Sequence, residues 1–452
     1  MMRRGGLLTI ACVLACASTK PERVRREVGD LVAARTGIDE GITPKQDAEA
    51  RASVQRRIDE ILREPLTVDG ALRVALLGNA SLQASLEQLG VAQAELVEAG
   101  LLENPMLSAD LVNSTRGNGL GGGLALSTSL LSAFLIPAKR RLAKAKLRHA
   151  VMTVGQGTLA LVRDVRVAFA DVQAAEASAT LHRELVQAAE LANDLAQAQS
   201  EAGNLPDLDR ERFAAALDDA RLELADALLE VTVAREHCNR LMGLWGDRVQ
   251  WRLAAELPAP PSGEAELATL EGRGVRDRLD VSSARAEVDA MLLALKLRRR
   301  GIVPQVEVGV TARNEVGNDP GHEWVLGPNV AIEIPIFDPG HADFAMLQAR
   351  LRQSQHQLQH AAIVARSEIR ELRERLLTAR RKAEYFAAEV LPRRKAIVER
   401  ALEQYNGMLI GTYELLETRS GQVEARHGYV EALRDYWAAR AELELAVGGR
   451  LE

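Results

Sequence analysis

Few residues in this sequence have the types and the spacing that chemistry requires. The glycine-rich segment 117–123 is similar to a phosphate-binding loop, but it lacks the lysine and the serine or threonine that complete one, and it lies between two predicted strands. His356 and His360 are one helical turn apart and could share a metal ion, but no third ligand lies nearby in the sequence. Nucleophile-elbow and metalloprotease motifs do not occur. We therefore expect no enzyme activity and no bound metal or cofactor.

Three carboxylates remain as candidates for a role in binding or selectivity. Asp207, Asp209 and Glu414 follow the glycine-containing turns at which the two longest predicted helices end. Carboxylates stabilise the positive end of a helix, and this interpretation needs no further function. In an oligomer, however, copies of the same carboxylates would form a ring, and such rings select cations. We carry both interpretations and treat the three residues as a candidate pore gate.

The first sixteen residues have the pattern of a bacterial export signal. Arg3 and Arg4 precede an apolar run of about ten residues, which is too short to span a membrane as a helix. The segment Val13–Cys16 resembles a lipobox and predicts cleavage before Cys16 and acylation of its thiol. Ala17 is not the aspartate that retains such lipoproteins on the inner membrane, so the outer membrane is expected. An ordinary signal cleaved near residue 15 or 17 remains the alternative.

The bulk composition narrows the function classes. The chain has 452 residues and a net charge of −6, so a nucleic acid is not an expected ligand. After the signal, no apolar stretch approaches the roughly 20 residues of a transmembrane helix, so a membrane role would need an anchor or a β-barrel. Of the three cysteines, Cys238 alone lies outside the signal region, and we expect it to be a small apolar residue on a helix.

The most regular pattern is a heptad spacing of apolar residues in two long segments. It predicts continuous helices from about Ala138 to Ala202 and from about His341 to Asn406. About 65 residues at roughly 1.5 Å each give a length near 100 Å, far beyond a usual globular helix. The two segments lie about 200 residues apart, which suggests a duplicated chain.

The elements around the two long helices recur in the same order. Each half is expected to contain a helix, two strands, the long helix and a further helix, with Thr67 as the cap of the first. In the first half these are Val68–Leu102, strands at Met106–Asn113 and about 124–130 separated by a loop at Asn113–Gly123, and Asp207–Met242. In the second half they are Leu279–Arg300, strands near 306–311 and 329–336 separated by a loop at 313–323, and Thr412–Val447. Residues 17–64 are polar and are expected to form an extended or partly helical arm.

Each predicted strand alternates aliphatic with polar residues, so one face would meet lipid and the other water. Open strand edges are not tolerated in lipid, and four strands cannot close a barrel. Three copies would supply twelve strands, which could close. The sequence thus predicts a mainly α-helical protein with a small membrane β-barrel contribution.

The order of these elements and their amino-acid sequences resemble those of the TolC-like outer-membrane efflux proteins. The matching segments are Leu66–Leu72, Leu102–Pro105, Ile334–Gly340, Leu391–Pro392 and Tyr405–Leu409. The resemblance covers the chain from about Leu66 to its end and rests on order, repeat and helix length more than on any single motif. Two features depart from the family pattern: aromatic residues are only 3 % of the chain, and an apolar run occupies Leu131–Pro137 at the first junction of strand and helix.

The resemblance implies a homotrimer with a twelve-stranded barrel that continues into a periplasmic tube of twelve helices. It implies a passive duct of a tripartite efflux system, whose partners are a periplasmic adaptor protein and an inner-membrane pump; the resistance-nodulation-division type is one candidate for the pump. The family places the adaptor contact at the helical turns, which in this chain are Gly203, Asn204, Leu205, Gly407, Met408 and Leu409.

The expected organisation is a signal peptide at 1–15, a lipidated arm at 16–64, and two repeats at 65–257 and 258–452. The expected location is the outer membrane, with the helical tube in the periplasm. The cargo could be small molecules or metal ions. Two alternatives remain: an outer-membrane duct for type I protein secretion, and a lipid-anchored periplasmic coiled-coil adaptor or structural rod.

Overall fold

A computed structural model describes residues 22–38, 48–113, 120–261, 263, 269–300, 306–316, 322–333, 336–337 and 339–451. The chain divides into two compact units, which are taken in turn. The sheet unit contains Gln88–Ala150 and Ala286–Ser354, together with the chain up to Val24. The hairpin unit contains Arg25–Glu87, Val151–Arg285 and Gln355–Glu452. No helix within the described residues is long and apolar enough to cross a membrane.

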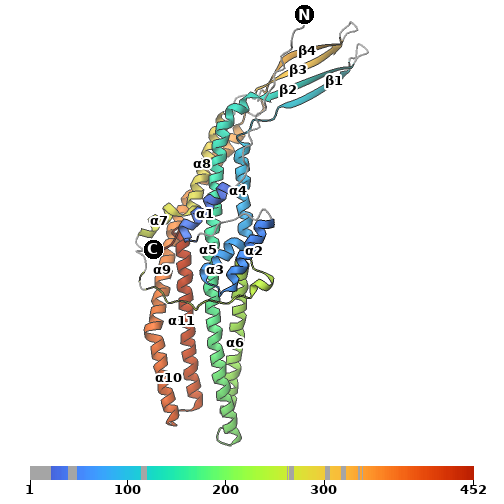
Figure 1. Cartoon of the computed structure of the whole chain (residues 1–452). Helices are drawn as coiled ribbons and strands as arrows, with labels where there is room; N and C mark the ends of the chain where they lie inside the picture. Colours follow the sequence, from blue (N-terminus) through green and yellow to red (C-terminus); the bar gives the residue numbers. More distant parts are fainter. Residues whose placement is uncertain are drawn as a thin grey trace. The chain divides into compact units, whose positions relative to one another are not determined.

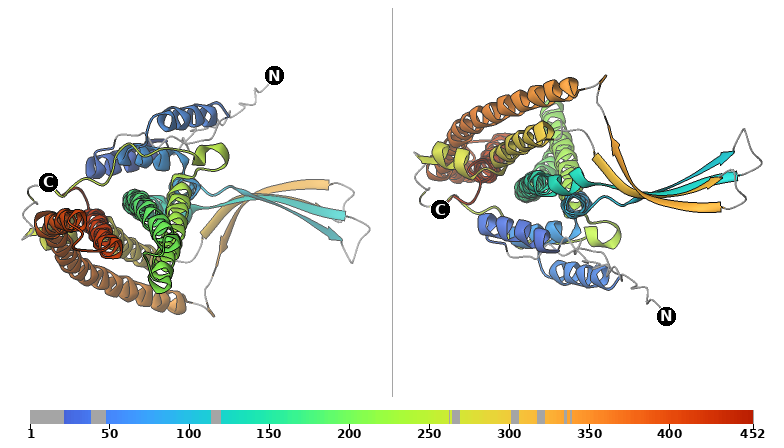
Figure 2. Two further views of the ribbon diagram at one scale, coloured as in Figure 1. Left: turned by 90° about the horizontal axis from the view of Figure 1, so that it is seen from below. Right: turned by 90° about the horizontal axis from the view of Figure 1, so that it is seen from above.

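The sheet unit is built on four antiparallel strands in the order β1-β2-β3-β4. Their bounds are β1 Met106–Asn113, β2 Leu120–Ser129, β3 Val306–Val316 and β4 His322–Ile332. Both views in Figure 2 show the strands twisting about one another. Strands from the two halves of the sequence pair along β2 and β3, so the two predicted strand pairs form one sheet.

The strand register confirms that one face of the sheet is aliphatic. Leu126 lies opposite both Leu107 and Val310, and Val308 lies opposite Val330. Because side chains alternate along a strand, these residues share a face. The polar residues, such as Ser127 opposite Gly309, take the other face. Most of the aliphatic side chains are exposed, and Leu111 is 80 % exposed. The sheet therefore presents an uncovered apolar face.

The strands are longer than the sequence pattern predicts, which corrects both predicted loops. Gly121–Gly123 belong to β2, where Gly123 pairs with Asp110, and residues 313–316 belong to β3. The fourth strand begins at His322, well before the predicted start near residue 329. Glycine misled the prediction because it usually marks a loop. In β2, Gly123 lies close to the side chain of Asp110 on the neighbouring strand. A Cβ built on Gly123 would lie 2.6 Å from a carboxylate oxygen of Asp110.

The first long helix, α5, runs from Leu130 to Glu201 and contains Pro137. It therefore begins eight residues before the predicted start at Ala138. The reason lies at its first turn, where the Ser132 N–H donates to Ser129 Oγ at 3.4 Å and the Ser132 hydroxyl donates to the Ser129 carbonyl at 2.8 Å. A serine cap starts the helix before the proline, and Pro137 then lies inside it. Proline in a helix interior removes one hydrogen bond, and the helix continues through that loss.

The predicted helix Val68–Leu102 is two helices, α3 Val68–Gly78 and α4 Ala80–Glu98. The break is at Asn79, which ends one helix and caps the next: its Oδ1 accepts from the Leu82 N–H at 2.8 Å. Its amide also donates to the Leu241 carbonyl at 2.9 Å. The predicted cap Thr67 is confirmed, since its hydroxyl accepts from the Gly70 N–H at 3.1 Å.

The polar N-terminal segment is partly helical, which is one of the two forms expected for residues 17–64, and its helices are packed rather than free. Helices α1 (Glu22–Thr36) and α2 (Ala48–Arg63) belong to the hairpin unit from Arg25 onward. Val28 and Val32 of α1 are buried. The Arg25 guanidinium pairs with Glu87 at 2.8 Å, and Arg248 pairs with Asp59 at 2.7 Å. The high charge of the segment hid a narrow apolar stripe.

The hairpin unit consists mainly of two long helical hairpins (Figure 1). The first joins α5 to α6 (Asp207–Met242), and the second joins α9 (His341–Tyr385) and α10 (Leu391–Asn406) to α11 (Thr412–Ala446). The heptad seam is confirmed: Leu181 and Leu185 of α5 pack in one cluster with Phe213 of α6 and Val423 of α11. Two short elements, η1 Gly246–Val249 and α7 Leu270–Asp277, were not predicted.

The second long helix keeps its predicted ends, but a π-helical turn, Phe386–Val390, interrupts it. Pro392 follows in the first turn of α10. Proline cannot donate to the carbonyl four residues earlier, and its ring crowds that carbonyl, so the backbone widens just before it. Both halves thus repeat the order helix, two strands, long helix, helix. The boundaries of the two repeats stay a prediction.

Candidate functional site

The first hairpin turn reverses the chain on a glycine, as predicted. Gly203 has φ 73°, in the left-handed region. Its N–H donates to the Ser200 carbonyl at 2.9 Å, and the Asn204 N–H donates to the Gln199 carbonyl at 2.8 Å. This pair of bonds satisfies the last carbonyls of α5. Pro206 then occupies the N-cap position of α6, without a capping side-chain hydrogen bond.

The second turn has the same bonds, but its glycine is displaced by one residue. The Met408 N–H donates to the Tyr405 carbonyl and the Leu409 N–H to the Gln404 carbonyl, both at 2.9 Å. The left-handed residue is therefore Met408, with φ 59°, whereas Gly407 has φ −83°. A left-handed conformation is costly for a residue with a Cβ. Met408 is also 94 % exposed, so the second turn is a strained, apolar projection. Figure 1 shows both turns at one end of the hairpin unit.

Two of the three candidate gate carboxylates, Asp207 and Asp209, pair with arginines that sequence analysis missed. Asp209 accepts from Arg212 at 3.1 Å, and Asp207 lies 4.0 Å from Arg210. Both pairs are three residues apart, a spacing that brings helical side chains together. Glu414 lies in the first turn of α11. A ring of these residues would thus carry arginines as well as carboxylates, and its charge depends on which of them faces the axis. The gate assignment stays a prediction.

The remaining sequence candidates lie only partly within the described residues. Cys16 and the segment before it lie outside those residues, so acylation stays a prediction. Cys238 is fully buried on α6, and burial raises the pKa of its thiol to about 12. His356 and His360 lie on α9, and no cluster of three potential metal ligands occurs among the described residues.

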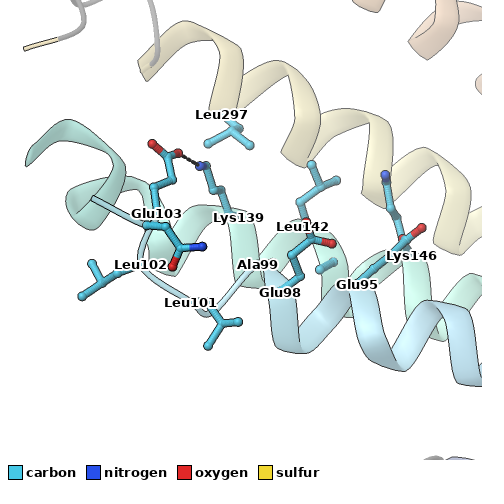
Figure 3. A pocket seen from close by; sticks show the side chains of 12 residues that line it. Glu95, Glu98, Ala99, Leu101, Leu102, Glu103, Lys139, Leu142, Lys146 and Leu297 are labelled. Carbon is cyan, nitrogen blue, oxygen red and sulfur yellow. Dashed lines mark hydrogen bonds and ion pairs between the residues drawn. The ribbon is translucent and has the colours of Figure 1, made fainter. Parts of the chain in front are cut away.

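A hydrophilic cavity lies in the sheet unit, where the strands meet the helices (Figure 3). This junction pocket has a volume of about 690 Å³ and lies among the end of α4, the early turns of α5, and α8 (Leu279–Arg300). Glu103 pairs with Lys139 across it at 3.1 Å. Glu95, Glu98 and Lys146 supply further charge, and Leu297 closes one side. The Glu103–Lys139 ion pair joins the segment after α4 to α5, which gives this position a structural role.

Comparison with known proteins identifies the fold. A family model described as outer membrane efflux protein matches residues 71–246, which span α3 to α6 and include β1 and β2. Residues 71–246 are thus similar to the outer membrane efflux protein family. No curated protein sequence matches the chain.

Solved structures extend this likeness over most of the chain. The outer membrane channel CmeC of Campylobacter jejuni is 15% identical, with a TM-score of 0.69 over 88% of this chain and 86% of that one. The outer membrane protein VceC of Vibrio cholerae is 15% identical, with a TM-score of 0.68 over 90% and 100%. The open state of the outer membrane channel MtrE of Neisseria gonorrhoeae is 16% identical, with a TM-score of 0.67 over 85% and 89%. This chain therefore has the fold of these outer membrane channels, mainly α-helical with a small sheet.

Proposed function

We propose that this protein is an outer-membrane channel of a tripartite efflux system, a passive duct whose energy comes from a pump elsewhere. The observation that carries the proposal is the sheet unit: one face of the sheet is aliphatic and largely exposed, and all four strands connect to long helices. An apolar face of this kind needs a lipid or protein cover. The family match and the channel fold support the same conclusion.

The assembly we propose is a homotrimer. Within the described residues, β1 pairs with β2 alone and β4 with β3 alone, so the sheet has two open edges. In lipid, open edges must be paired. Three copies joined edge to edge, β4 to β1, would form twelve strands and leave no edge. The helical hairpins of the three copies would then form the tube.

The two hairpin turns are the proposed contact with a periplasmic adaptor. Gly203, Asn204, Leu205, Gly407, Met408 and Leu409 lie at one end of the hairpin unit, where Met408 and Leu409 are strongly exposed. Exposed apolar residues on a defined turn are suited to a protein partner. Asp207, Asp209 and Glu414 are the proposed gate, and an inner-membrane pump completes the system.

The location we propose is the outer membrane, with the helical hairpins in the periplasm and an acyl anchor on Cys16. A periplasmic adaptor or rod is disfavoured, because the apolar face of the sheet would then be exposed to water. Small molecules or metal ions are the proposed cargo class.

Reconstitution tests this function. The purified protein should be a trimer by native mass spectrometry and should conduct ions in planar bilayers. A stable monomer that folds its sheet in detergent and conducts nothing would refute the channel. Deleting the gene should sensitise cells to the cargo, and complementation should reverse the effect.

A further inference from the structure

The sheet unit carries an uncompensated cluster of positive charge on the helix that follows β2. Between Leu130 and Arg163, α5 contains no acidic residue; the first is Asp164. Its exposed basic residues begin just after Pro137, although the chain as a whole has a net charge of −6. Lys139 pairs with Glu103, and Lys146 lines the junction pocket that Glu95 and Glu98 also line. Four others, which we call the basic stripe, are Arg140, Arg141, Lys144 and Arg148.

The basic stripe lies on one face of α5. At 100° per residue, Arg140, Lys144, Arg148 and Arg141 fall within about a quarter of the helix circumference. All four side chains are exposed. Toward the sheet, the same face continues with Pro137 and Phe134, and Phe134 is 80 % exposed. One helix face thus changes from apolar beside the strands to basic farther away.

Within the described residues, no carboxylate forms an ion pair with Arg140, Arg141, Lys144 or Arg148. Arg298 of α8, by contrast, pairs with Asp343 at 3.0 Å. Arg140 and Lys144, like Lys144 and Arg148, are four residues apart, and like charges at that spacing destabilise a helix. An external anion that neutralises the stripe would remove this repulsion.

The distances place the stripe next to the apolar band of the sheet. β2 has 10 residues, the length of a tilted transmembrane strand. The apolar segment from Leu130 to Pro137 then rises by about 12 Å, and the stripe follows it. Basic residues that lie just beyond a membrane-embedded segment bind anionic lipids. Arginine adds a planar group that can donate two hydrogen bonds to one phosphate.

We propose that the basic stripe binds the phosphates of anionic phospholipids in the membrane leaflet nearest the helical hairpins. This inference rests on the proposed function, because it requires the aliphatic sheet face to lie in lipid. The end of α8 supports this proposal. Lys296, Arg299 and Arg300 are also exposed, and they lie in the last turns of α8, the helix that precedes β3 in the sequence. The stripe would fix the depth of the channel in the membrane.

Native mass spectrometry of the full-length protein tests the proposal, with phosphatidylglycerol and phosphatidylcholine as probes. The wild type should retain phosphatidylglycerol over phosphatidylcholine. Neutralising all four residues to Gln should weaken phosphatidylglycerol retention at least tenfold, since each basic residue near a membrane surface contributes about a fivefold factor. Replacing the three arginines by Lys should preserve the retention, because the charge remains.

The matched control removes four exposed positive charges from the hairpin unit: Arg375→Gln, Arg393→Gln, Lys395→Gln and Arg400→Gln. It should leave lipid retention unchanged. Equal retention of phosphatidylglycerol by the wild type and the stripe variant would overturn the proposal. So would competition by inorganic phosphate at the same concentration, which would identify a free-anion site.

Planar-bilayer recording separates this proposal from the proposed function. A wild type that conducts but shows no phosphatidylglycerol preference refutes the lipid site and leaves the channel intact. A wild type that neither conducts nor forms a trimer refutes the channel itself. If the stripe variant changes the reversal potential in neutral lipid and keeps its lipid retention, the stripe lines the pore and the lipid site is wrong.

Discussion

The displaced glycine of the second hairpin turn gives a sharp test of how the turns are built. In the first turn Gly203 occupies the left-handed position, whereas in the second Met408 occupies it, beside Gly407. A left-handed residue with a Cβ costs roughly 1–2 kcal/mol. Glycine removes that cost but loses more chain entropy on folding, roughly 0.5–1 kcal/mol. We therefore expect Met408→Gly to stabilise the second turn by about 0.5–1 kcal/mol.

Two further substitutions serve as comparisons: Gly203→Ala, which introduces a Cβ at a left-handed position, and Gly407→Ala, which is expected to be neutral. Gly203→Ala should destabilise the first turn by about 1 kcal/mol, and backbone strain would be the cause, because no other atom lies within 4 Å of a Cβ built there. Gly407→Ala is the matched control, since its φ of −83° suits any residue and its nearest neighbour, 3.5 Å away, is at ordinary contact distance. This control should be neutral or slightly stabilising.

Hydrogen exchange of the turn amides is the appropriate assay, because a long helical protein need not unfold in one step. Met408→Gly should slow exchange of the Leu409 amide about two- to fivefold, the factor that corresponds to 0.5–1 kcal/mol. Gly203→Ala should speed exchange of the Asn204 amide by a similar or larger factor. Faster exchange in Met408→Gly, together with slower exchange in Gly203→Ala, would show that the left-handed backbone is not what limits these turns.

Four further outcomes follow from particular residues. Asn79→Ala should cost about 2–3 kcal/mol in denaturant unfolding, because it removes a helix cap and leaves a carbonyl without its donor; Ser81→Ala, at an exposed position of α4, should cost under about 0.5 kcal/mol. Cys238 should resist thiol reagents at pH 8 until the protein is denatured, since burial raises its pKa to about 12; reaction in the native state would show that α6 opens locally. Burial raises the pKa of Asp171 above its usual value of 3.8, so folding binds its proton and stability falls as pH rises through that window. Asp171→Asn should therefore flatten the pH dependence of the melting temperature above pH 4, and an unchanged profile would contradict the burial. Replacing Asp207 and Asp209 together by Asn should shift the pore toward anions in a salt-gradient recording, because the partner arginines remain; an unchanged reversal potential, also with Glu414→Gln, would reduce the carboxylates to helix caps.

The elements that sequence analysis predicted well are those in which local signals and long-range packing agree. Helix α6 begins after Pro206 and ends at Gly243, which has φ 70°, so a start signal and a stop signal coincide with a heptad seam. The two faces of the sheet follow from the strict alternation of apolar and polar residues. A shift of the strand pairing by two residues would leave each side chain on the same face. Such features need no knowledge of the partner element.

The errors occurred where one residue has two plausible local roles. Asn79 continues an amphipathic run in sequence, yet its side chain caps α4 because Leu241 supplies an acceptor from 162 positions away. Gly121–Gly123 signal a loop, but pairing with β1 makes them strand. Pro137 suggests a helix start, but the serine cap begins α5 earlier. In each case a distant contact or a competing helix cap determines the structure that forms. The local sequence pattern alone cannot show which of the two local structures is more stable.

The functional residues that the sequence hid are charges whose meaning depends on their surroundings. Arg212 becomes relevant to the gate only because its guanidinium pairs with Asp209, which neutralises one of the carboxylates that suggested the gate. The basic stripe is the opposite case: among the described residues no carboxylate pairs with Arg140 or Lys144, whereas Glu103 pairs with Lys139. A charge paired within the chain is structural, and a charge left unpaired beside an apolar face is available to a partner. In a chain with only 3% aromatic residues, the lipid contact that we propose for the basic stripe would provide an anchor that aromatic side chains give other membrane proteins.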